Sequence, residues 1–295
     1  CVCAETRAAG RPRAGKRRGA AGMIEMLLQP FQFPFMQNAF WIALIVAPPC
    51  ALLSCLLILK GWALMGDAVS HGVLPGIVLA YMAGLPLLLG AFVAGLSTAL
   101  LTGWIAENSR VKRDTVMGVV FSAMFALGIV LISAFPTDLH LDHILFGNML
   151  GIGRADLQTA LAIAGPVTLI LALKWRDFML HAFDPAQAQV SGLQVRLLHY
   201  GLLAILSLTI VATLSSVGLI LAIGLLIAPG AIAFLLTRSF GAMLVTSTLV
   251  CLAAMLAGVW ASFHLDSAPA PTIVLILTGM FLLAFLRRSL ATRAA

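Results

Sequence analysis

Runs of about twenty apolar residues recur along the chain between residues 39 and 286, and short polar or charged segments separate them. A helix of about 20 apolar residues crosses the hydrocarbon core of a bilayer. The backbone must satisfy its own hydrogen bonds in lipid, so each run must be helical. The pattern predicts an all-α, polytopic integral membrane protein with about eight or nine transmembrane helices, some of them interrupted by proline and glycine. The expected spans are 39–59, 62–84, 86–106, 115–134, 156–174, 197–214, 217–236, 241–262 and 270–286.

The composition also indicates a membrane protein, and most of the excess positive charge lies in one segment. Charged residues make up only 10% of the chain, whereas a soluble domain averages about 25%. Residues 1–22 contribute +5 of the net charge of +7, so the charge does not indicate a nucleic-acid-binding surface. We expect residues 1–22 to be a basic, disordered leader without the apolar stretch of a secretory signal. Met23 is then the natural start, and residues 23–295 form a single transmembrane domain.

The distribution of lysine and arginine predicts how the helices are oriented. Eleven of the twelve basic residues after the leader fall on one side under the expected helix order, and only Arg154 falls on the other. Short cytoplasmic loops of membrane proteins are enriched in lysine and arginine. We therefore expect a multi-pass protein of the bacterial cytoplasmic membrane, with the basic side and the C-terminus in the cytoplasm.

Asp67 and His71 stand out at membrane depth. Asp67 is the one acidic residue that lies inside an expected span and not at its end, and His71 is the one histidine near the middle of a span. Their spacing of four residues puts them on one helical face. Ionisable groups at this depth are costly and usually face a bundle interior or an aqueous path. Carboxylate and imidazole suit Mn²⁺, Fe²⁺ or Zn²⁺ better than Cu⁺, so the pair predicts a path for a divalent metal. The alternative is a hydrogen bond that only joins helices.

Two proline–glycine pairs predict interrupted helices. Pro75 has no N–H group and lies four residues after His71, so the carbonyl group of His71 is available as a third metal ligand. Gly72 and Gly76 allow another backbone to approach. The Pro-Gly pair at 229–230 repeats the pattern in a later span, where it predicts a kink that lines the path.

Two clusters on the expected outer side also carry metal-ligand residue types. His140 and His143 lie in a loop that contains two aspartates, and His264 and Asp266 lie at the outer mouth of the last two helices. Imidazole and carboxylate donors suit a divalent metal. The alternative for the first cluster is a solvated loop that contacts a partner protein, whereas the second cluster is a candidate outer gate.

The chain contains no Gly-x-x-x-x-Gly-Lys-Ser/Thr motif, so it has no loop of this type to bind the phosphates of ATP. The longest loop on the expected cytoplasmic side, 175–196, contains a candidate contact for a separate ATPase. Asp184 is a predicted N-cap, Pro185 a first helical residue, and Gly192 the end of a short helix that includes Ala188. A loop without such a role is the alternative.

Four segments are specific enough in combination to suggest a family: 66–76 (GDAVSHGVLPG), 114–118 (DTVMG), 143–148 (HILFGN) and 229–230 (PG). They resemble the permeases of ABC-type metal importers of the zinc, manganese and iron class, over about residues 26–290. The segments 60–62 (KGW) and 146–148 (FGN) resemble the manganese and chelated-iron branch most closely.

The resemblance implies a permease that works with a second permease chain, either a copy or a paralogue. It also implies two cytoplasmic P-loop ATPase subunits and an extracytoplasmic metal-binding protein. Asp67 and His71 would line the path of Mn²⁺ or Fe²⁺, and the loop with Asp184, Ala188 and Gly192 would contact the ATPase. We expect no enzymatic activity and no permanently bound cofactor in this chain, since the divalent metal is the cargo.

Other functions stay open from the sequence. Zn²⁺ accepts the same donors as Mn²⁺ and Fe²⁺. An ion-coupled secondary metal transporter would use the same pair without an ATPase, although no second acid lies inside an expected span to relay protons. An intramembrane hydrolase would need a His-Glu-x-x-His pair or a Ser–His pair at matching depth, and the sequence offers neither.

Overall fold

The computed structural model describes residues 29–135, 147 and 149–293, and all regular secondary structure within these residues is helical, as predicted. The expected leader, 1–22, lies outside the described residues. The elements are η1 (Gln29–Gln32), α2 (Pro34–Leu59), α3 (Met65–Met82), α4 (Leu87–Asn108), α5 (Arg113–Ala134), η2 (Met149–Gly151), α7 (Arg154–Phe183), α8 (Pro185–Val190), α9 (Val195–Val217), α10 (Leu219–Leu236), α11 (Phe240–His264) and α12 (Pro269–Arg293).

Nine long helices of the described residues correspond to the nine expected spans. Eight of them have the length and hydropathy of a membrane-crossing segment. The ninth is α3, which has only 18 residues and carries Asp67 and His71. It packs among α4, α5, α9 and α10, and most of its residues are buried. Among the described residues, the one long helix that falls short of these criteria therefore lies inside the bundle.

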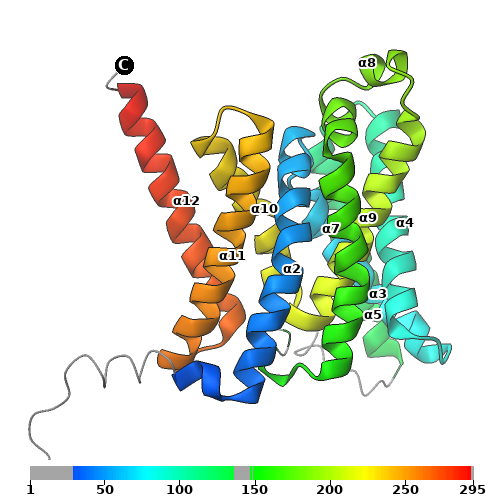
Figure 1. Ribbon diagram of the computed structural model, residues 1–295. Helices are drawn as coiled ribbons and strands as arrows, with labels where there is room; N and C mark the ends of the chain where they lie inside the picture. Colours follow the sequence, from blue (N-terminus) through cyan, green and yellow to red (C-terminus); the bar gives the residue numbers. More distant parts are fainter. Residues whose placement is uncertain (1–28, 136–146, 148, 294–295) are drawn as a thin grey trace, which may run out of the picture.

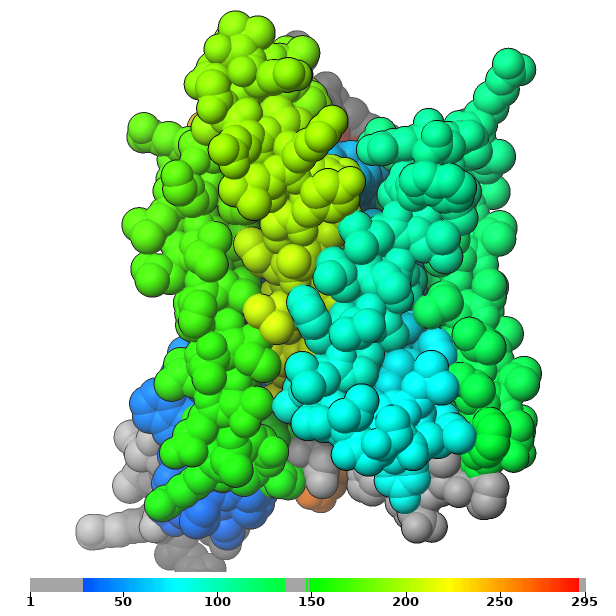
Figure 2. Space-filling view, turned by 90° about the vertical axis from the view of Figure 1, so that its right-hand side faces the viewer, coloured from blue at the N-terminus to red at the C-terminus, as the bar shows by residue number. Residues whose placement is uncertain are grey.

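The helices alternate in direction, so their order decides which helix ends lie together. Figure 1 shows α8 and the C-terminal end of α12 at the same end of the bundle, which we call the α8 end. Lys60, residues 110–113, Arg196 and Arg238 belong to this end, and Arg154 begins α7 at the opposite end. The predicted asymmetry of basic residues is thus present in the fold. On the adjoining face, α9 lies between α7 and α4 (Figure 2).

Several helix ends differ from the predicted spans. α7 continues to Phe183, although the expected span ends at residue 174. The charged residues around 174–177 suggest an end to the span, but Phe178 and His181 further along are buried, so packing continues the helix past these charges. α2 begins at Pro34 instead of residue 39, and α12 extends to Arg293 instead of residue 286.

The prolines inside α3 and α10 do not end these helices. α3 runs through Pro75 and α10 runs through Pro229. The predicted interruption is therefore limited to one missing backbone hydrogen bond in each helix. The proline has no N–H group to donate, so one carbonyl group in the preceding turn lacks its usual donor.

Candidate metal site

The start of α3 determines where Asp67 and His71 lie. The helix begins at Met65, and Asp67 is in its first turn. The sequence predicts both side chains inside a longer helix, 62–84, whereas the structure places Asp67 at the N-terminal end. Free N–H groups and aligned peptide dipoles make this end of a helix electropositive. Asp67 is therefore an acidic residue at the end of α3 where acidic residues are commonly found.

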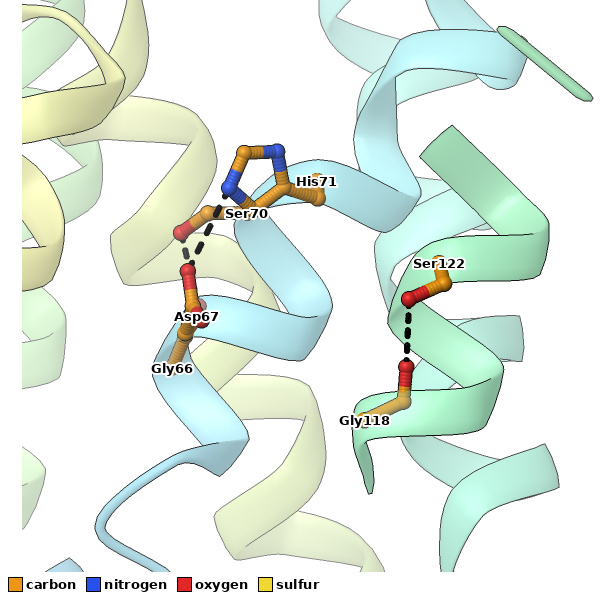
Figure 3. A network of polar contacts seen from close by, with 6 residues as sticks. All are labelled: Gly66, Asp67, Ser70, His71, Gly118 and Ser122. Carbon is orange, nitrogen blue, oxygen red and sulfur yellow. Dashed lines mark hydrogen bonds and ion pairs between the residues drawn. The ribbon is translucent and has the colours of Figure 1, made fainter. Parts of the chain in front are cut away.

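Asp67 and His71 face one another across one helical turn (Figure 3). The Nε2 atom of His71 lies 3.3 Å from Oδ1 of Asp67, and the side chains are 16% and 30% exposed, respectively. Two donors about 2.1 Å from one ion lie about 3.0–3.4 Å apart at octahedral or tetrahedral angles. The two atoms are thus spaced like neighbouring ligands of one cation. Because the contact lies within α3, it does not join two helices, which argues against the structural alternative.

Two phenylalanines of α5 hold the imidazole ring of His71. The ring centroid of His71 lies 4.8 Å from that of Phe121 and 4.9 Å from that of Phe125, with the second pair edge-to-face. Nδ1 of His71 is buried and has no hydrogen-bond partner among the described residues. The packing from α5 therefore fixes a ring orientation that presents Nε2, and not Nδ1, to Asp67.

The glycines of the same segment pack α3 onto α4, and the predicted approach of another backbone occurs at Gly76. A Cβ atom at Gly72 would overlap the side chain of Thr98, and one at Gly76 would overlap the carbonyl group of Gly90 and the Cβ atom of Ala94. No other residue type fits this approach without movement of a helix. One face of α3 is therefore used for close packing on α4, while Asp67 and His71 occupy another face.

The second proline–glycine pair has a packing role that the sequence does not predict. The Ser54 hydroxyl on α2 donates to the Ile227 carbonyl at 3.1 Å and accepts from the Gly230 N–H at 2.9 Å. A Cβ atom at Gly230 would lie 2.6 Å from Ser54 Oγ, and Pro229 is buried. The pair thus forms a buried junction between α2 and α10, and its place along the path stays a prediction.

Of the outer candidates, His264 and Asp266 do not join Asp67 and His71. His264 ends α11 at the end opposite α8, where its ring packs 4.3 Å from Trp260. Asp266 is exposed and has a positive φ of 47°. α11 packs on α2, α10 and α12, whereas α3 packs on α4, α5, α9 and α10, so α10 lies between the two. His140 and His143 lie outside the described residues.

The loop between α7 and α9 forms the predicted short helix. The Asp184 carboxylate accepts a hydrogen bond from the Gln187 N–H at 3.0 Å, and Pro185 begins α8. Gly192 follows the helix with a φ of 79°. Ala188 is fully buried and Val190 is 83% exposed, so α8 is anchored on one side and presents the other to solvent.

Phe121 and Phe125 belong to the site, but their residue type does not identify them in the sequence as site residues. They are spaced four apart on α5, as Asp67 and His71 are on α3, so an aromatic pair matching the polar pair is visible in the sequence. Nothing in that spacing shows that α5 is the neighbour of α3. The structure supplies this information.

The comparisons with known proteins agree with the fold and the motifs. Residues 32–288 match the ABC 3 transport family. The chelated iron transport system membrane protein YfeD of Yersinia pestis is 56% identical over 264 residues, which are 90% of this chain and 89% of that protein. The manganese transport system membrane protein MntB of Synechocystis sp. is 43% identical over 261 residues, which are 88% of this chain and 85% of that protein.

Solved structures show the same likeness. PsaBC from Streptococcus pneumoniae in complex with Fab superposes with a TM-score of 0.79 at 34% identity, over 89% of this chain and 95% of that chain. The sequence and structural matches both extend over most of the bundle. This multi-pass membrane protein therefore belongs to the ABC 3 transport family, as a permease and not an enzyme.

Proposed function

We propose that the chain is the permease subunit of an ATP-driven importer that moves Mn²⁺ or Fe²⁺ across the bacterial cytoplasmic membrane. The observation that carries the proposal is the Asp67–His71 pair, whose oxygen and nitrogen are spaced as ligands of one ion on an inner helix. Oxygen and nitrogen donors suit these metals. The relatives named for chelated iron and manganese transport support the same cargo.

The Asp67–His71 pair supplies only part of a coordination shell. Mn²⁺ and Fe²⁺ take more ligands than the two that this pair supplies. No group of three or more His, Cys, Asp or Glu residues that could hold a metal occurs among the described residues. Asp67 remains 30% exposed, so a second permease chain, a copy or a paralogue, can supply further ligands to the same ion together with water.

The two ends of the bundle have different partners in this proposal. The α8 end and the C-terminus face the cytoplasm, because the basic residues gather there. A pair of P-loop ATPase subunits contacts α8, whose boundaries are set by Asp184 and Gly192 around the buried Ala188. An extracytoplasmic metal-binding protein delivers the ion at the opposite end, where His264 and Asp266 lie.

The test is ATP-dependent uptake of radiolabelled Mn²⁺ into proteoliposomes that contain the permease, its ATPase and its binding protein. Asp67→Asn and His71→Ala should each lower uptake by at least about tenfold, because each removes a ligand of the passing ion. Asp177→Asn is the matched control, since this carboxylate pairs with Lys174 on α7 at 3.1 Å. Unchanged uptake in either α3 variant overturns the assignment, and competition by Fe²⁺ and Zn²⁺ establishes the preferred metal.

A further inference from the structure

A polar pocket lies at the α8 end, away from Asp67 and His71. It has a volume of about 500 Å³, and its charged or imidazole-bearing lining residues are Lys60, Glu107, Arg113, His181, Arg196 and His199. These residues come from the end of α2, from α4, α5, α7 and α9, so five segments meet there. Figure 2 shows the hollow near the top, between α9 and the neighbouring ends of α4 and α5, with part of α2 at its base.

The charges in this pocket are unbalanced. Lys60, Arg113 and Arg196 are cationic, and Glu107 is the one carboxylate in the lining. None of the three cations forms an ion pair with a carboxylate of the described residues. Lys60 is partly buried and Arg113 lies near enough to repel it, and this repulsion is stronger than it would be in bulk water, whereas Arg113 and Arg196 themselves are exposed. An anion in the pocket would remove that cost.

The ammonium group of Lys60 is positioned by two contacts and has further N–H donors available. Its Nζ atom lies 2.8 Å from Nε2 of His181 and 4.2 Å from the ring centroid of Trp62. An ammonium group only donates, so Nε2 of His181 accepts and the proton of that imidazole is on Nδ1. One of the three ammonium donors is used in this contact. The other two have no carboxylate partner among the described residues, so Lys60 is positioned as an anion ligand.

We propose that this α8-side pocket binds a phosphate anion, either the phosphodiester of an anionic phospholipid or a free phosphate ion. Guanidinium groups match the oxygens of phosphate in pairs, and lysine acts as a point charge beside them. Basic pockets between transmembrane helices on the cytoplasmic side suit anionic headgroups. Tyr200 in the lining is 56% exposed, and the adjacent Leu197 is 67% exposed, so apolar surface for an acyl chain borders the polar pocket.

The test is native mass spectrometry of the purified full-length permease, titrated with phosphatidylglycerol, phosphatidylcholine or inorganic phosphate. We expect Lys60→Gln and Arg196→Gln each to weaken binding of the anionic ligand by about tenfold, the effect of one charge-assisted hydrogen bond. Lys60→Arg keeps the charge and should retain most of the binding. Arg238→Gln removes an exposed cation at the same end, outside the pocket, and should change binding less than about twofold.

The titrations also distinguish the two sources of phosphate. Tighter binding of phosphatidylglycerol than of phosphatidylcholine, without measurable binding of inorganic phosphate, identifies a lipid headgroup, and binding of inorganic phosphate identifies a free anion. The proposal is overturned if neither ligand binds, if both lipids bind equally, or if Arg238→Gln weakens binding as much as the pocket variants. The proposal is also overturned if the pocket variants still bind the anionic ligand but no longer bind the ATPase subunit. In that case the pocket would bind a carboxylate side chain of the ATPase. Size-exclusion profiles establish that each variant is folded.

Discussion

The Nε2 atom of His71 lies 3.3 Å from Oδ1 of Asp67 one turn earlier on α3. The nitrogen and the oxygen both belong to α3, so the distance between them is set by the local helix geometry. The orientation of the imidazole is set by Phe121 and Phe125, which belong to α5. The site therefore combines a ligand spacing fixed by α3 with a ring orientation fixed by α5.

Removal of the aromatic support should weaken metal transport without removing a ligand. In Phe125→Ala, the His71 ring loses an edge-to-face contact worth about 0.5–1.5 kcal/mol and gains rotational freedom. We expect the KM for Mn²⁺ uptake to rise several-fold while the protein still inserts in the membrane. Phe234→Ala on α10 is the control, because this side chain is 55% exposed. Equal effects of the two substitutions would contradict the positioning role.

The close packing of α3 on α4 should make Gly76 intolerant of any side chain. Gly76→Ala places a Cβ atom against the Gly90 carbonyl and the Ala94 side chain, and overpacking of this kind costs about 1–3 kcal/mol. Gly165→Ala on α7 adds the same methyl group where no atom lies within 4 Å. Thermal unfolding in detergent should show a lower Tm for the first variant only.

The N-cap of α8 offers a test of the contact with the ATPase. Asp184→Ala removes the acceptor of the Gln187 N–H and should destabilise the six-residue α8 helix by about 1 kcal/mol. Asp184→Asn keeps a capping oxygen and is the matched control. We expect weaker stimulation of the ATPase in the alanine variant, measured as metal-dependent ATP hydrolysis, and near-normal stimulation in the asparagine variant. If the two variants behave alike, the cap is not what couples the subunits.

Binding of an anionic lipid in the α8-side pocket should depend on pH. Burial and the nearby Arg113 lower the pKa of Lys60 to about 8, and Glu107 opposes this shift. His181 contacts the same ammonium group and His199 lies beside it in the pocket. Only the protonated amine attracts an anion, so affinity should be full below pH 8 and fall as the pH rises above it. Phosphatidylglycerol is the suitable probe, because its phosphodiester does not titrate in this range.

Lys60→Arg is the control for this pH dependence, because arginine stays protonated up to a pKa above about 12. The variant should bind phosphatidylglycerol equally well at pH 7 and pH 9. A decline of the same size in the wild-type protein and the variant would assign the pH dependence to another group.

The features that depend on local chemistry are predictable from the sequence. Asp67 and His71 stand out because few ionisable residues interrupt the apolar runs, and their shared face follows from their spacing. The short helix α8 follows from Asp184, Pro185 and Gly192, which act on their immediate neighbours. The role of each residue in transport is a separate matter and stays a prediction.

The features that depend on which helices are neighbours are not predictable in this way. The Pro-Gly pair at 229–230 suggests only a path-lining kink in the sequence. In the structure, the Gly230 N–H donates a hydrogen bond to the hydroxyl group of Ser54, about 175 positions away in the chain. The length of α7 is a similar case, because buried Phe178 and His181 outweigh the charged residues before them. Both outcomes depend on packing between helices that are distant in the chain.

The contact between Gly76 and Gly90 has a mechanical consequence. Two helices whose backbones touch cannot slide past one another without steric overlap, so α3 and α4 behave as one rigid body. Near His71 the boundary between α3 and α5 is made by the side chains of Phe121 and Phe125, whereas further along α5 Gly128 approaches Leu74 and Pro75 closely. Rotation of these two rings is therefore the smallest rearrangement that would change the surroundings of His71.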